Sequence, residues 1–338
     1  MSKLIRDIRF SILDLAPIVM GGAPTESLRN SLDLAKHAEK WGYKRYWVAE
    51  HHSMPGIASS ATSVVIGYLA GGTSSIRVGS GGIMLPNHSP LVIAEQFGTL
   101  ESLYPGRIDL GLGRAPGTDQ ITAQALRRGP ERYGEDFPDL LTELVSYFLP
   151  QRDTRVGAVR AIPGEGLQIP MWLLGSSDFS ARLAGQMGLP FAFASHFAPN
   201  LTLPALEIYR KNFRPSQSLD KPYAMIGVNV VAAETDDDAK RLATSMQQQV
   251  LSLLRGRPGQ LKPPVDSIED LCTDYEKAVL EERSRFTVVG SKDTVLQGLQ
   301  RFLDETQADE MIVSAQIYNH QARLRSYEIL SEIFLDMN

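Results

Sequence analysis

The chain has 338 residues, of which 43% are hydrophobic and 22% are charged, and this composition is typical of a folded globular protein. The formal net charge is -5 and no run of lysine and arginine is present, so we expect neither nucleic acid nor a membrane surface as a partner. The single cysteine excludes an internal disulfide, and the early charges in MSKLIRDIRF do not resemble a secretory signal. We therefore expect a cytoplasmic protein.

Strand and helix signals alternate from the first residues onward. Apolar runs predict strands at 8–15, 45–50 and 76–82, and helical spacing predicts a helix at 25–41. Ser89 and Pro90 suit the N-cap and first position of a further helix. The remaining strands are predicted at 107–113, 170–175, 189–195, 225–233 and 309–315. Eight such βα units predict an α/β protein with a closed (β/α)8 TIM barrel, in a single domain spanning residues 1–338.

Two segments interrupt this alternation. Residues 53–76 are uncharged and long enough for a membrane span, but their serine, threonine and glycine content favours a buried or dimer-forming helix. Residues 255–264 are rich in glycine and proline and precede a polar helix. We expect an insertion at about 255–285 in the seventh βα unit, either a lid near the barrel mouth or a surface insertion without a role.

Histidines gather after the predicted strands, at positions 51, 52, 88, 196 and 320. The unperturbed pKa of histidine lies near neutrality, and the C-terminal ends of barrel strands form the functional face of the fold, so we expect the site there. Adjacent strand residues point to opposite sides, which predicts that one of His51 and His52 faces the mouth and the other faces outward. Glu50, His51 and His52 lack the spacing of a zinc motif, so we expect no metal.

An anion site is predicted after the fourth and fifth strands. Arg114 leaves one strand with a fixed charge and a forked set of donors, and Ser176, Ser177 and Ser180 lie where the next helix begins. The alternatives are a structural ion pair for Arg114 and simple helix capping by the serines. The stretch GLGRAPG at 111–117 matches a dinucleotide fingerprint poorly, because its last glycine is one residue late.

Polar and glycine residues near other strand ends leave two readings open. Gly81 and Gly82 either make a tight turn or let the backbone approach a flat ligand. Asp14, Asn229 and Gln316 are each more consistent with a satisfied polar group of the barrel than with a ligand contact.

Taken together, several stretches resemble the bacterial luciferase-like flavin monooxygenase family, and its single-polypeptide oxidoreductases in particular. They are WVAEHH, VGSGGIMLPNHSPLVIAEQFGTL, YPGRIDLGLGRAPG, PMWLLGSSDFSARLAGQMGLPFAFASHF and VVGSKDTV. The resemblance implies a barrel that binds reduced FMN from a separate flavin reductase. It also implies reaction of the reduced FMN with O2 to a C4a-peroxyflavin that oxygenates a small organic substrate.

The resemblance also implies roles for single residues. His51 corresponds to a histidine that assists proton transfer beside the flavin. Arg114 and the three serines Ser176, Ser177 and Ser180 correspond to the phosphate site. Gly81 and Gly82 correspond to a pair joined by a non-prolyl cis peptide bond behind the flavin ring.

Further implications concern assembly and alternatives. His52 and Glu95 correspond to residues that meet across a homodimer interface formed by helices around 58–75 and 90–103. Gly113 stands where the light-emitting subunit has a reactive cysteine, which leaves room for another flavin pose or a bulkier substrate. An FMN-dependent monooxygenase is thus the leading hypothesis. The alternatives are an FMN-binding protein without oxygenase turnover, an F420-dependent oxidoreductase and, more distantly, a metal-dependent hydrolase.

Overall fold

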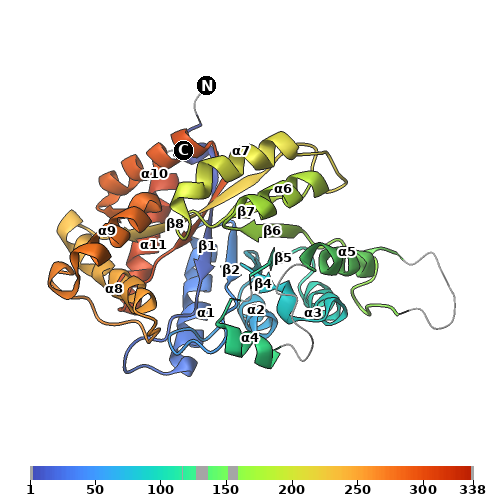
Figure 1. Cartoon of the computed structure of the whole chain (residues 1–338), viewed down its shortest axis with the longest axis horizontal. Coiled ribbons are helices and arrows are strands. Elements are labelled where there is room, and N and C mark those ends of the chain that lie inside the picture. The colour runs from blue at the N-terminus through green and yellow to red at the C-terminus, as the bar shows by residue number, and fades with distance from the viewer. Residues whose placement is uncertain (1–2, 116, 127–135, 151–158, 336–338) are drawn as a thin grey trace.

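The computed structural model describes residues 3–115, 117–126, 136–150 and 159–335. Within them, eight parallel strands close into a barrel in the order β10, β1, β2, β3, β5, β6, β7 and β8, with β8 pairing back to β10 (Figure 1). The strands are β1 (Arg9–Asp14), β2 (Arg45–Val48), β3 (Arg77–Ser80), β5 (Ile108–Gly113), β6 (Met171–Gly175), β7 (Phe191–Phe193), β8 (Ala224–Ala232) and β10 (Glu310–Ser314). The predicted (β/α)8 barrel is confirmed, and each strand lies within two residues of its predicted bounds.

Two short strands supplement the barrel, and the sequence patterns did not predict either of them. β4 (Ile83–Met84) continues the path of β3 beyond Gly81 and Gly82 and pairs with β5. β9 (Thr287–Gly290) pairs with the last residues of β8. Both are short for recognition from an apolar run, because a strand signal needs several alternating residues.

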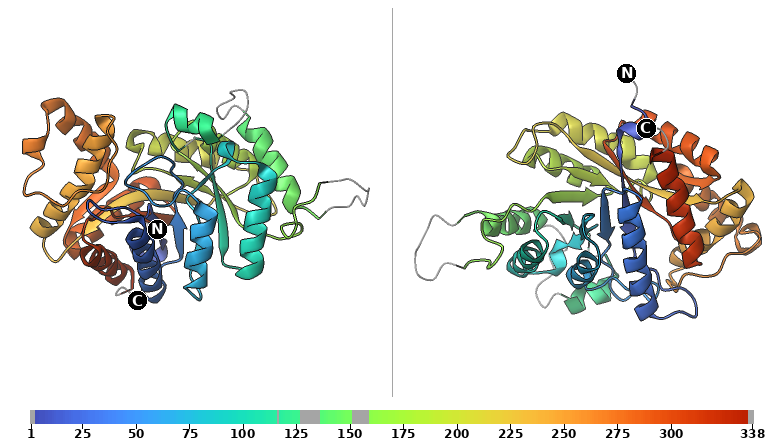
Figure 2. Two further views of the ribbon diagram at one scale, coloured as in Figure 1. Left: turned by 90° about the horizontal axis from the view of Figure 1, so that it is seen from below. Right: turned by 180° about the vertical axis from the view of Figure 1, so that it is seen from behind.

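Helices pack around the outside of the barrel (Figures 1 and 2). The outer ring comprises α1 (Pro24–Lys40), α2 (Thr62–Gly71), α3 (Pro90–Leu103), α5 (Phe137–Phe148), α6 (Asp178–Met187), α7 (Thr202–Asn212), α10 (Lys292–Thr306) and α11 (His320–Leu335). Residues 53–76 thus contribute only the ten-residue helix α2. Within the described residues, no helix is both long and apolar enough to cross a membrane.

Additional helical elements lie outside this ring. They are α4 (Gln120–Leu126), α8 (Asp236–Leu254), α9 (Asp274–Arg283) and the 3-10 turns Ile5–Asp7, Leu85–Asn87, Pro199–Leu201, Glu269–Leu271 and Ser284–Phe286. α8 and α9 form a lobe beside the barrel, between β8 and α10 in the chain (Figure 1). Structured additions therefore begin at Asp236, earlier than the insertion predicted at about 255–285. Leu261 joins this segment to the loop after β1, since its N–H donates to the Ile18 carbonyl at 2.9 Å.

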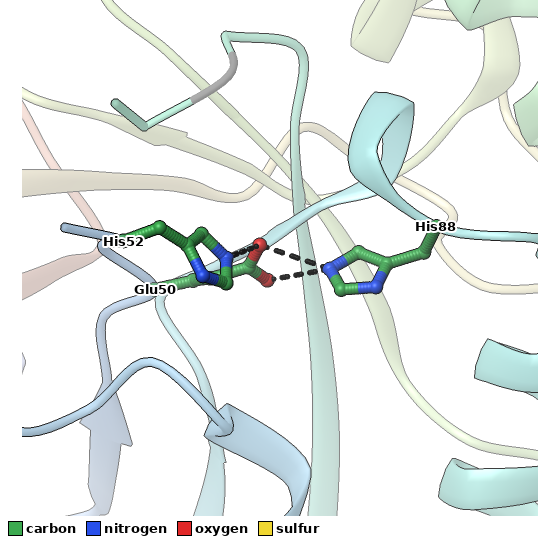
Figure 3. Close-up of side chains that lie close together, drawn as sticks. All are labelled: Glu50, His52 and His88. Atoms are coloured by element: carbon green, nitrogen blue, oxygen red, sulfur yellow. Dashed lines mark hydrogen bonds and ion pairs between the residues drawn. The ribbon is translucent and has the colours of Figure 1, made fainter. Parts of the chain in front are cut away.

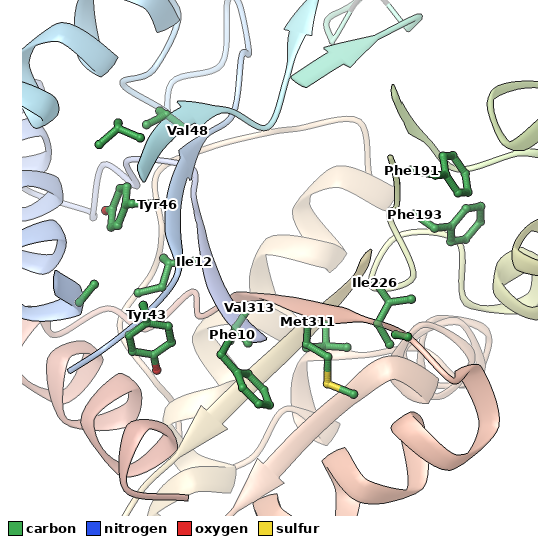
Figure 4. Close-up of a cluster of buried hydrophobic side chains, with 14 of the residues drawn as sticks. Phe10, Ile12, Tyr43, Tyr46, Val48, Phe191, Phe193, Ile226, Met311 and Val313 are labelled. Carbon is green, nitrogen blue, oxygen red and sulfur yellow. The ribbon is translucent and has the colours of Figure 1, made fainter. Parts of the chain in front are cut away.

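Side chains alternate between the two faces of each strand, as the pleat requires. On the outer face, large apolar side chains such as Ile12, Tyr46 and Phe193 pack with the helices in the main core (Figure 4). On the inner face, a smaller cluster fills the middle of the barrel. It consists of Leu13, Trp47, Ala49, Trp172, Ala192, Met225 and Ile312. The barrel is thus a packed body with two separate apolar clusters, and not an open tube.

A network of buried charges lies below the inner cluster, at the N-terminal ends of the strands. Arg45 binds Asp109 and Glu310, each at 2.7 Å, and Arg77 binds Asp109 at 2.6 Å. Both carboxylates are fully buried, and Tyr223 donates a further hydrogen bond to Glu310 at 2.9 Å. Because the carboxylates are fully paired, these charges can remain buried and close the base of the barrel.

Candidate active site

Small residues occupy the inner face above the apolar cluster, at the C-terminal ends of the strands. They are Gly81, Gly113, Ser176, Ala194, Gly227 and Ser314. Gly81 faces Leu13 and Trp47 of the inner cluster, and each of the other five lies two residues after an inward-facing residue of its strand. Six strand ends thus carry a small residue above the bulky side chains of the inner cluster, at the end of the barrel where barrel proteins bind their ligands.

The predicted phosphate residues lie together at one side of this mouth. The Arg114 guanidinium carbon lies 4.3 Å from the ring centroid of Phe179, the second residue of α6. Arg114 forms no ion pair with any other described residue, so the structural pairing considered from the sequence has no partner in this part of the chain. Its charge faces the start of α6, where the serines lie.

The serine hydroxyls at this helix start are available for a ligand. Ser177 occupies the N-cap of α6, yet its side chain makes no capping hydrogen bond. Ser176 and Ser180 likewise have no hydrogen-bond partner among the described residues. A β-carbon at Gly175 would lie 2.5 Å from that of Ser180, so only glycine permits this close approach of strand and helix. Unused hydroxyls, free N–H groups and an arginine together fit a phosphate group.

His51 follows the end of β2 and contacts the loop after β5, which begins with Arg114. Its Nδ1 is 3.0 Å from the carbonyl oxygen of Gly117. Since a carbonyl only accepts, Nδ1 carries the proton of the neutral ring and Nε2 keeps a lone pair. Burial lowers the pKa of His51, and the Gly117 carbonyl and Glu50 only partly oppose this effect. The ring is therefore held neutral, in the form that accepts a proton.

Gly81 and Gly82 are joined by a cis peptide bond, which confirms that part of the prediction. Neither position has room for a side chain. A β-carbon at Gly81 would lie 2.7 Å from Leu13 Cδ1, and one at Gly82 would lie 2.7 Å from the Gly111 carbonyl oxygen. The backbone here consequently presents a surface without side chains to the barrel mouth.

Next to His51, the buried carboxylate of Glu50 holds two further histidines (Figure 3). His52 Nε2 and His88 Nε2 both lie 2.9 Å from Glu50 Oε1, and the N–H of Met84 donates to Oε2 at 3.1 Å. Burial acts to raise the pKa of Glu50, but the hydrogen bonds from His88 and His52 outweigh it, so the pKa is lowered. The ionised carboxylate thus ties the end of β2 to β4 and the turn after it.

This cluster bears on two predictions made from the sequence. His51 and His52 have different hydrogen-bond partners, but both lie beyond the last residue of β2, so the alternation of one facing the mouth and one facing outward stays a prediction. A carboxylate with two imidazoles is also a zinc-binding set, with ligand atoms here within 4.8 Å of one another. Each imidazole nevertheless lies at hydrogen-bonding distance from the carboxylate, which explains the arrangement without an ion; the prediction of no metal stays a prediction.

The polar residues at other strand ends differ in their environment. Asp14 is fully buried and accepts hydrogen bonds from Arg323 at 2.7 Å and Tyr46 at 2.5 Å, which confirms it as a satisfied group of the barrel. His196, after β7, was noted in the sequence only as one of the histidines after strands. Its Nδ1 is buried without a hydrogen-bond partner among the described residues, and burial lowers the pKa of His196 to about 4.

A parallel barrel with its polar side chains at the C-terminal strand ends has the layout of the (β/α)8 barrel enzymes. The family model for luciferase-like monooxygenases matches residues 8–310. The chain belongs to this family, as its sequence stretches indicated.

Similar proteins cover nearly the whole chain. A luciferase-like monooxygenase of Escherichia coli (strain K12) is 55% identical, with 97% of each chain covered. The uncharacterized protein YvbT of Bacillus subtilis (strain 168) is 59% identical, also with 97% of each chain covered. Among solved structures, apo-MsnO8 is 35% identical with a TM-score of 0.85, covering 97% of this chain and 98% of its own.

More distant similarities include a named monooxygenase and two solved structures. An N-acetyl-S-alkylcysteine monooxygenase of Bacillus subtilis (strain 168) is 32% identical and covers 97% of this chain and 98% of its own. The oxygenating constituent of 3,6-diketocamphane monooxygenase, solved with FMN, and an F420-dependent secondary alcohol dehydrogenase share the fold, with TM-scores of 0.72 and 0.70. At 18% and 12% identity, these two show a common fold alone.

Proposed function

We propose that the protein is a flavin-dependent monooxygenase that uses reduced FMN and O2 to oxygenate a small organic substrate. Bound reduced FMN would supply the electrons for O2 activation, and a separate flavin reductase would provide it. The observation that carries the proposal is the site at the start of α6, where Arg114 and the unpaired hydroxyls of Ser176, Ser177 and Ser180 meet. These donors suit a dianionic phosphate ester, which FMN has and unphosphorylated riboflavin lacks.

The remaining site residues support a flat ring beside this phosphate site. Gly81 and Gly82 offer backbone without side chains, as a stacked ring system needs. His51, held neutral and with Nε2 unprotonated, is the proposed group that accepts and returns a proton at the reacting centre. A positioned acid or base of this kind contributes about 10² to 10⁴ in rate. The organic substrate would bind in the same mouth, within reach of His51.

We also propose a homodimer through α2 and α3. Exposed apolar side chains lie at helical spacing on both helices: Val64 and Tyr68 on α2, and Val92 and Leu103 on α3, with exposures between 43% and 71%. Such a row on two neighbouring helices is costly in water and typical of an interface. Glu95 lies on α3 without a described side-chain partner, consistent with a contact across the dimer to a region near His52.

The function is tested with binding and turnover together. Fluorescence titration of the purified protein with FMN and with F420 decides the cofactor; we expect FMN to bind and F420 not to compete. O2 uptake is then followed with enzymatically reduced FMN and a panel of organic substrates, including an N-acetyl-S-alkylcysteine. A protein that binds F420 in place of FMN is an F420-dependent oxidoreductase. One that binds FMN without oxygenating any substrate is a flavin carrier.

A further inference from the structure

Three buried polar groups without partners among the described residues lie in one stretch of chain, which runs from the end of β7 to the first residue of α7. They are the Ser195 hydroxyl, the His196 Nδ1 atom and the Thr202 hydroxyl. Buried polar groups in native proteins are nearly always hydrogen-bonded, so each exception needs an explanation. These three atoms fall within eight consecutive residues, 195–202, that begin just after β7, at the C-terminal end of a barrel strand, where a ligand would supply a missing partner.

The first two of these residues are fixed beside the site already described. The N–H of Ala194 donates to the Gly175 carbonyl at 2.9 Å, which places Ser195 near Gly175, the residue before Ser176. The N–H of His196 donates to the Gly227 carbonyl, also at 2.9 Å. The backbone is thus anchored to the strands on both sides, β6 and β8.

The His196 ring occupies the inner face of the barrel. Met225 of β8 belongs to the inner apolar cluster, so Gly227, two residues later, faces the same side. A β-carbon at Gly227 would lie only 2.2 Å from His196 Nδ1. The absence of a side chain at Gly227 therefore makes room for the imidazole. Nδ1 and the adjacent Cε1 lie against β8, and Nε2 has no hydrogen-bond partner among the described residues.

We propose that His196 and Ser195 form a hydrogen-bonding subsite of the barrel mouth that binds an uncharged polar group of the ligand. His196 presents Nε2 to this group. The group belongs either to the edge of the flavin ring or to the organic substrate, both of which carry amide or carbonyl functions. This inference rests on the proposed function, because it takes the mouth to be the ligand site.

The chemistry of the subsite favours an uncharged partner. The shift of the His196 pKa to about 4, caused by burial, keeps the ring neutral at ordinary pH, so it offers no cation to a carboxylate or phosphate. No described carboxylate forms an ion pair with His196 either. The anionic end of FMN is instead served by Arg114. The two subsites thus divide the ligand between a charged part and a neutral part.

Binding measurements test the subsite. Dissociation constants for FMN, riboflavin and N-acetyl-S-methylcysteine are compared in the wild type, His196→Phe, His196→Gln and Ser195→Ala. Loss of one neutral hydrogen bond should raise the dissociation constant of the contacted ligand about fivefold. Glutamine, which keeps an N–H near the place of Nε2, should restore most of the affinity. His37→Phe on α1 is the matched control, because that imidazole bonds the Asp33 carbonyl far from the mouth.

The three ligands identify the source of the bound group. A flavin contact weakens FMN and riboflavin equally and moves the ¹⁵N signal of His196 Nε2 when either is added. A substrate contact leaves both flavins unaffected, and N-acetyl-S-methylcysteine then moves the signal. If no probe moves it and all affinities stay within twofold, the inference is wrong, while wild-type binding of FMN still supports the proposed function.

Thermal stability without ligand supplies a second criterion. A hydroxyl kept for a ligand destabilises the empty protein, so Ser195→Ala should melt at the same temperature as the wild type or higher. If the hydroxyl is instead hydrogen-bonded within the fold, its removal should lower the melting temperature. A clear fall in Tm for both Ser195→Ala and His196→Phe would overturn the inference.

Discussion

Replacing Arg114 by alanine should weaken FMN binding selectively. Arg114 lies over Phe179 at 4.3 Å and faces unpaired hydroxyls, so its charge is free to serve a phosphate. A hydrogen bond to a charged group contributes about 1.5 to 3 kcal/mol. For a half-buried guanidinium we take about 2 kcal/mol, which corresponds to a loss of about 30-fold in affinity.

Riboflavin makes this experiment specific, because it has the same ring system without the phosphate. Dissociation constants for both ligands are measured by fluorescence quenching at two salt concentrations. We expect the loss for FMN alone, with a weaker salt dependence of FMN binding in the variant. Arg114→Lys keeps the charge but loses the two parallel N–H donors, so its affinity for FMN should lie between those of the wild type and Arg114→Ala. Arg182→Ala is the matched control, because Arg182 is an exposed arginine on α6, the helix at whose start the serines lie.

Two results would refute the phosphate assignment. Equal weakening of FMN and riboflavin would mean that Arg114 contacts the ring or supports the local fold. Unchanged affinity for both would mean that the phosphate binds elsewhere, and the single observation behind the proposed function would be lost.

Four further outcomes follow from the described contacts. His51→Gln should keep FMN affinity within about threefold but slow oxygenation at least tenfold, measured as O2 uptake with substrate; an unchanged rate argues against a proton-transfer role. The pKa of His196 is about 4 in the folded protein and 6.5 in the unfolded chain, so the unfolded chain binds the proton first as the pH falls. The free energy of unfolding should therefore fall between pH 6.5 and pH 4, by at most about 3 kcal/mol. In urea unfolding, this free energy should depend less on pH in His196→Phe than in the wild type, and an identical pH dependence contradicts the shift. Glu50→Ala removes the acceptor that His52 and His88 share, and it should lower the free energy of unfolding by about 2 to 4 kcal/mol in urea unfolding. Glu50→Gln should lower it by less. Equal stability of the wild type and both variants would mean that the buried carboxylate does not hold β2 and β4 together. Tyr68→Glu on the exposed face of α2 should convert a dimer to a monomer in light scattering, whereas a dimer that survives it uses another surface.

The barrel was predictable because its signals are local. Each strand is an apolar run closed by glycine or a polar residue, and the helix from Ser89 and Pro90 begins where capping preferences place it. The helices α8 and α9 after β8 were harder to predict from the sequence. The polar face of α8 is compatible with an ordinary barrel helix, and only the later helix α10, packed between α7 and α11, shows that α8 lies outside the ring.

The site was predictable in part, for a related reason. Residues at strand ends, such as His51 and Arg114, follow from position along the chain. Their neighbours across the mouth depend on tertiary contacts that no local pattern encodes. Glu50 meets His88 across 38 positions, because the 3-10 turn Leu85–Asn87 after β4 brings His88 next to the end of β2. The seating of His196 on Gly227 likewise depends on the pairing of neighbouring strands, and its only signal in the sequence was a glycine inside β8.

The buried charges of Arg45, Asp109 and Glu310 have a consequence for how the molecule exchanges material with its surroundings. Because these paired side chains fill the N-terminal end of the barrel, a ligand of the proposed active site would enter and leave past the loops at the opposite end. Changes in those loops would then alter which ligands gain access, without disturbing the buried ion pairs.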